Sequence, residues 1–131
     1  MINFENNTEN FESFEKKALS PLNFLTSKII LVNGNSKRLT IPIILRNRFL
    51  ESDKVRLFYK VETGDCYIDF QFNSEQIVPE KVEFKDVKII KTGWSYFITL
   101  PTKWFKYIKP TKASLTQLDI KKTVYKVDLY D

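Results

Sequence analysis

The chain has 131 residues, 43% of them hydrophobic and 28% charged, which excludes a chain disordered throughout and fits one domain or two very small ones. It has no histidine and a single cysteine, which excludes Ser-His and Cys-His nucleophiles and an internal disulfide. The net charge of +5 divides into −2 for residues 1–25 and +7 for the rest, and a basic body suggests a polyanionic partner.

Residues 1–25 are acidic and rich in phenylalanine. Phe11, Phe14 and Ala18 recur at helical spacing, and Pro21 would end a helix. The segment is therefore expected to be either a short amphipathic helix or a disordered arm, and its phenylalanines are expected to cover the body or contact a partner.

Residues 26–72 are predicted to form a hairpin, a helix and a second hairpin. The strands "SKIILV" and "RLTI" flank the turn "NGNSK", and Pro42 then blocks the ladder and starts a helix. In "IILRNRFL" the arginines point away from the apolar face. The strands "VRLFYKV" and "CYIDFQF" follow, joined by a turn at Gly64.

Residues 73–85 are charged, contain Pro79 and are predicted to be a connector. In residues 86–131 the order repeats: "VKIIK" and "YFITL" flank "TGWS", "PTKWFKYI" is predicted to be a short helix with Trp104 and Ile108 inward, and two strands close the chain. Residues 28–58 and 87–117 align without a gap at an offset of 59, which indicates an internal duplication.

The phrases "GNSKRLTIP", from Gly34 to Pro42, and "KIIKTGWSYFITLPTKWFKYI" resemble the AbrB/MazE/SpoVT swapped-hairpin DNA-binding module, the second in an archaeal variant. In that family two chains interleave their hairpins into one small barrel. The resemblance implies a mainly β chain with two short helices, folded as an intrachain pseudo-dimeric barrel with an N-terminal arm. We expect a monomer equivalent to a family dimer, with a homodimer as the alternative.

The resemblance also implies a sequence-specific DNA-binding protein, a transcriptional regulator that binds double-stranded DNA through the first hairpin of each repeat. The candidate residues in and around these hairpins and the first helix are Lys28, Asn35, Lys37, Arg38, Arg46, Arg48, Lys88, Lys91, Trp94 and Tyr96. A solvated surface face is the alternative explanation for the same cations, Lys37 and Arg38 included. Trp94 could stack on bases, anchor a protein or fold back onto Phe97, whereas Trp104 is predicted to lie in the core.

A second interpretation is a protein-interaction module, antitoxin-like or a viral or orphan protein, that uses the barrel as a scaffold and binds a partner through residues 1–25. No catalytic constellation, metal-ligand spacing or cofactor motif is present in the sequence, so we expect neither an enzyme nor a cofactor. No apolar run approaches the roughly 18 residues of a membrane span, and we expect a cytoplasmic protein.

Overall fold

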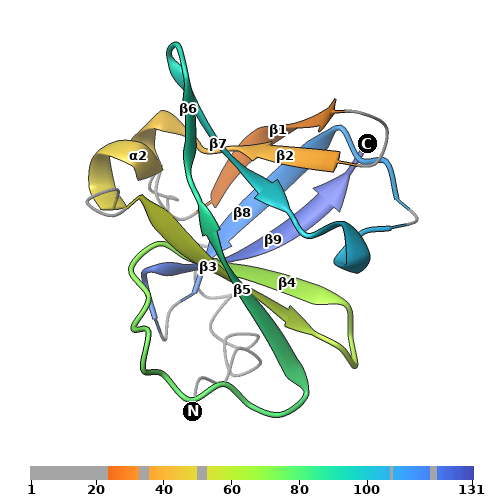
Figure 1. Ribbon diagram of the computed structural model, residues 1–131. Coiled ribbons are helices and arrows are strands. Elements are labelled where there is room, and N and C mark those ends of the chain that lie inside the picture. The colour runs from red at the N-terminus through yellow and green to blue at the C-terminus, as the bar shows by residue number, and fades with distance from the viewer. Residues whose placement is uncertain (1–23, 33–35, 50–52, 107, 119–120) are drawn as a thin grey trace, which may run out of the picture.

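The computed structural model describes residues 24–32, 36–49, 53–106, 108–118 and 121–131 (Figure 1). The strands are β1 Phe24–Val32, β2 Ser36–Thr40, β3 Lys54–Lys60, β4 Asp65–Asp69, β5 Val82–Lys88, β6 Ile90–Thr92, β7 Ser95–Leu100, β8 Lys112–Gln117 and β9 Val124–Tyr130, and the helices are α2 Ile43–Phe49 and the 3-10 turn η1 Thr102–Trp104. The predictions for the N-terminal helix or arm and for Asn35 lie outside the described residues.

All nine strands belong to one antiparallel sheet in the order β5-β3-β4-β9-β8-β1-β2-β7-β6. The strands at the two ends of this order, β5 and β6, follow one another in the chain and are separated only by Ile89. The sheet therefore curls into a nearly closed barrel (Figure 1). The prediction of a mainly β chain is confirmed.

The pairing register relates the two halves of the sheet. Leu39 pairs with Ile98 between β2 and β7, and Tyr67 pairs with Lys126 between β4 and β9. Both pairs join residues 59 positions apart, which is the offset between the similar sequence segments. The ladders β1–β8 and β3–β5 also join strands from different halves of the chain, so each half completes the sheet of the other.

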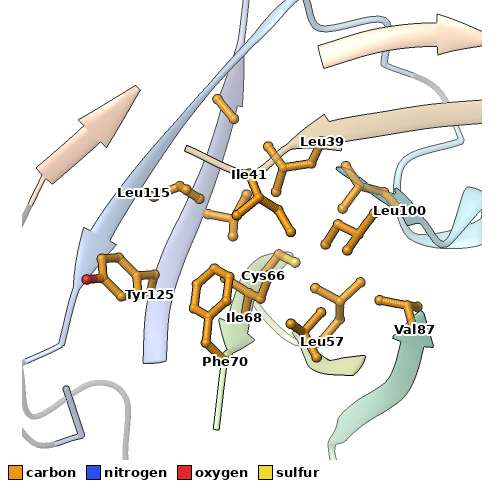
Figure 2. Packing of buried hydrophobic residues seen from close by; sticks show 14 of the residues in the cluster. Leu39, Ile41, Leu57, Cys66, Ile68, Phe70, Val87, Leu100, Leu115 and Tyr125 are labelled. Carbon is orange, nitrogen blue, oxygen red and sulfur yellow. The ribbon is translucent and has the colours of Figure 1, made fainter. Parts of the chain in front are cut away.

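The barrel interior is filled by aliphatic side chains from most strands and from α2 (Figure 2). Leu45, Leu57 and Ile68 are fully buried, and Phe49 stacks on Phe70 with ring centroids 5.8 Å apart. Because successive side chains of a strand point to opposite faces, Phe58, next to Leu57, joins a second buried cluster on the other face of the sheet.

Two predicted boundaries are wrong. The connector ends at Lys81 rather than residue 85, because β5 begins at Val82 and pairs with β3 along its length. β5 is charged because it stands at one end of the strand order, and edge strands commonly carry charged side chains. The predicted strand over residues 87–91 is also interrupted at Ile89, whose N–H donates to the carbonyl of Asp53 at 2.7 Å.

The predicted second helix is reduced to the 3-10 turn η1, so the described residues contain one α-helix. Trp104 is buried as predicted, but Ile108 is 44% exposed instead of facing inward. The turn ends at Trp104 because Phe105, which follows it, has a φ of −129° and a ψ of 31°, outside the helical region. None of the helices in the described part of the chain is long and apolar enough to cross a membrane.

Candidate nucleic-acid interface

Basic and acidic residues are segregated along the chain. Residues 24–50 contain five Lys or Arg and residues 87–118 contain six, and neither segment contains Asp or Glu. These segments supply β1, β2, α2, β6 and β7, which lie together in the upper part of Figure 1, and also η1 and β8. Charge arranged in this way gives one region of the barrel a positive potential.

Four ion pairs among the described residues lie outside these two segments. Arg56 pairs with Asp86, Lys81 with Glu62, Lys121 with Asp69 and Lys126 with Asp65, whereas Lys103 reaches Glu83 from within the second segment. A count of charge in short windows would have revealed this segregation from sequence. Dividing the net charge only at residue 25 concealed this segregation, because the remainder of the chain contains both acid-free and acidic segments.

Four of the predicted residues meet where α2 approaches the β6–β7 hairpin, and we call Arg46, Lys91, Trp94 and Tyr96 the tip cluster. The Nη1 atom of Arg46 donates a hydrogen bond of 2.8 Å to the carbonyl oxygen of Trp94. The guanidinium carbon of Arg46 lies 3.7 Å from the ring centroid of Tyr96, and the Nζ atom of Lys91 lies 5.1 Å from the same centroid. A cation from α2 thus ties the hairpin turn to the helix.

The β6–β7 turn is a two-residue loop, since Thr92 pairs with Ser95. Gly93 has a φ of +57°, which is the positive value that tight hairpin turns require at this position. The hairpin projects from the sheet beside α2 (Figure 1). At its end the side chain of Trp94 is 93% exposed, so the alternative in which it folds back onto Phe97 is wrong.

Arg38 covers Phe97 instead. The guanidinium carbon lies 4.7 Å from the ring centroid, and Phe97 is only 5% exposed. Both residues belong to the face of the β2–β7 ladder that is turned away from the inward pair Leu39 and Ile98. Arg38 therefore remains at the surface as predicted, but one side of its guanidinium packs against an aromatic ring.

Lys37 contradicts its prediction as a projecting cation. It is 3% exposed and lies on the same face of β2 as Leu39, because residues two apart in a strand point to the same side. The sequence held this information in the alternation of Lys37, Leu39 and Ile41, but we interpreted Lys37 as a turn residue. The structure therefore does not present its side chain to solvent, whereas the prediction placed it on a projecting turn.

Three further candidates, Lys28, Arg48 and Lys88, are exposed. Lys28 in β1 lies directly opposite Lys112 in β8, and Lys88 in β5 lies directly opposite Lys54 in β3. All four of these lysines are exposed, and opposite partners in a ladder project from the same face. The sequence analysis missed Lys54 and Lys112 because only the strand register brings them beside the candidates.

A groove of about 700 Å³ runs between Val82–Lys85 in β5 and Pro101–Trp104. Trp104 stacks on Tyr59 at 5.2 Å, and its Nε1 atom donates to the Glu83 carboxylate at 2.7 Å. This hydrogen bond, together with Lys103, lowers the pKa of Glu83, so the groove keeps a carboxylate and does not suit a polyanion. Among the described residues no three metal-binding side chains are grouped to hold an ion.

Comparison of the chain with protein-family models, with curated proteins and with solved structures finds no match in any of the three.

Proposed function

We propose that the protein binds double-stranded DNA as a transcriptional regulator of the AbrB/MazE type, with both swapped-hairpin halves supplied by one chain. The observation that carries the proposal is the pair of acid-free segments, with eleven Lys and Arg, that build β1, β2, α2, β6, β7, η1 and β8. Cations gathered on segments that contain no carboxylate favour the phosphate backbone over a mixed protein surface, except at η1, where Lys103 reaches Glu83.

The opposed lysines support the same proposal. Like charges directly opposite one another in a ladder are destabilising, and the pair Lys28–Lys112 places such charges in the β1–β8 ladder. A phosphate placed between two ammonium groups relieves their repulsion. The unfavourable pairing in the free protein thus becomes a favourable contact in a DNA complex.

The pairs Leu39–Ile98 and Tyr67–Lys126 support the proposal that one chain is equivalent to a family dimer. With each half completing the sheet of the other, a monomer has no need of a second copy. In the mechanism we propose, cations of the barrel bind phosphates and fix the register. A two-stranded hairpin of the size of β6–β7 enters the major groove, and the bound protein blocks access to a promoter.

The test is a fluorescence-anisotropy titration of a random-sequence DNA duplex of about three helical turns, at several salt concentrations between roughly 50 and 200 mM. Each phosphate contact contributes about 0.9 to the slope of log affinity against log salt. Lys28→Ala and Lys88→Ala are expected to weaken binding and to lower this slope by about one contact each.

The matched control is Lys81→Ala, which removes the same charge from an exposed lysine that pairs with Glu62. It is expected to leave the slope unchanged. Absence of any salt-dependent binding by the wild-type protein would overturn the proposal. If the control lowers the slope as much as the other two variants, binding follows net charge and not this surface.

A further inference from the structure

Trp94 is the most exposed large apolar side chain among the described residues, at 93% of its surface. The second tryptophan, Trp104, is 8% exposed, stacks on Tyr59 and donates its indole N–H to Glu83. The fold therefore gives one tryptophan packing and hydrogen-bonding partners and places the other in solvent. Neither the core nor the barrel closure requires an indole at the hairpin end.

The backbone that carries Trp94 is fixed in place. The two-residue loop with Gly93 at positive φ sets the direction of the turn, and the Arg46 guanidinium holds the Trp94 carbonyl at 2.8 Å. Arg46 is itself seated 3.7 Å above Tyr96, which Lys91 also approaches. A turn whose backbone is held in this way loses little backbone freedom on binding, so less of the contact energy is spent on ordering the loop.

We infer that the indole of Trp94 stacks on a nucleobase of the bound DNA, an inference that rests on the proposed function. The tip cluster combines what such contacts use, a solvent-facing aromatic ring with cations beside it for the neighbouring phosphates. Lys91 and Arg46 supply those cations, and the tip cluster lies wholly within the two acid-free segments. Stacking is tolerant of base identity, so this contact adds affinity more than sequence selectivity.

The position 59 residues before Trp94 holds Asn35, which has no aromatic ring. These two equivalent positions therefore offer one aromatic ring between them, and this contact is asymmetric even on a symmetric site. The base can come from two sources, a step opened between base pairs of an intact duplex or an unpaired base. The experiment separates them by its DNA substrates.

The experiment uses Trp104→Phe, which leaves Trp94 as the single tryptophan emitter. It is titrated at low salt with the random duplex, the same duplex with one unpaired base, and the corresponding single strand. Stacking quenches the emission of Trp94, and the substrate that quenches most strongly identifies the source of the base. In the wild-type background Trp94→Ala is expected to weaken binding about 5- to 150-fold, and Trp94→Phe less, because a ring remains.

The control Ile77→Ala removes another exposed apolar side chain, 83% exposed and outside the two acid-free segments, and is expected to bind as the wild type does. Unchanged affinity of Trp94→Ala would overturn the inference and, if the lysine variants still lose affinity, leave the proposed function intact. Failure of the wild type to bind any DNA would overturn both the inference and the proposed function. A blue shift of Trp94 emission with phosphatidylserine vesicles, with no change on DNA, would assign the indole to membranes and overturn the inference.

Discussion

Replacement of Asp86 by alanine tests whether β5 is an integral part of the barrel. Arg56 in β3 and Asp86 in β5 form a two-point ion pair, with Nε–Oδ1 at 2.5 Å and Nη2–Oδ2 at 2.9 Å. The guanidinium also lies between the rings of Phe72 and Phe84, at 4.6 and 4.5 Å, and the Arg56 side chain is 4% exposed. Asp86→Ala leaves this buried cation without its carboxylate.

Removal of one member of a buried pair costs about 3–5 kcal/mol. The Asp86 side chain is 35% exposed, so water can reach the vacated space, and we expect a loss of about 3 kcal/mol in the free energy of unfolding. Arg56→Met is expected to cost less, because the remaining carboxylate can be hydrated while an apolar chain still fills the space between the rings. The double variant should therefore be more stable than Asp86→Ala alone.

The assay is urea unfolding followed by circular dichroism, and Glu62→Ala is its control. Glu62 pairs with Lys81, but both side chains are largely exposed, so no measurable change is expected. A loss below about 1 kcal/mol for Asp86→Ala, or a double variant no more stable than the single one, would refute the claim that an unpaired buried guanidinium carries the cost.

Two further predictions concern pH and backbone conformation. Burial raises the pKa values of Cys66 and Tyr125 to about 12, so the unfolded chain releases these protons first, and the free energy of unfolding should fall as the pH rises from about 9 towards 12. Cys66→Ala should remove the fall between pH 9 and 10 in urea unfolding and retain part of it above pH 10, whereas an unchanged profile would contradict this assignment. Gly93→Ala should cost about 1 kcal/mol through its positive φ alone, since no atom lies within 4 Å of the added Cβ. Gly64→Ala, where the nearest atom of Tyr59 lies at an ordinary 3.7 Å, should cost a similar amount, and a much smaller loss at Gly93 would show that the turn relaxes.

The strands and the core were predictable because their apolar residues alternate and are bounded by turn residues. Leu57 and Ile68, for example, lie inside as their strands require. β5 was not predictable in this way, because an exposed edge strand with charges has the composition of a connector. Its identity depends on the partner strand β3, which lies more than twenty residues earlier in the chain.

The candidate site was predictable only in part, because some of its residues are brought together by strands and helices that are remote in the sequence. Trp94 and Lys91 could be placed at a hairpin end from their neighbours in the sequence. Arg46 joins them only through the packing of α2 against the turn, and Lys54 and Lys112 only through strand register. Distances between residues that are remote in the chain are set by the closed sheet, which no local pattern encodes.

The divergence of the two halves has a structural explanation in the β2–β7 ladder. Two pairs of residues that lie 59 positions apart differ between the halves, Lys37 and Tyr96, and Arg38 and Phe97. The guanidinium of Arg38 lies above the ring of Phe97 across the ladder. Two arginines at these positions would repel one another, and two phenylalanines would expose an apolar surface. Unlike residues at equivalent positions therefore stabilise the contact between the halves. The surface loses its symmetry as a result. Because the tip cluster is built on the β6–β7 hairpin, in one half of the chain, the proposed DNA complex is also asymmetric.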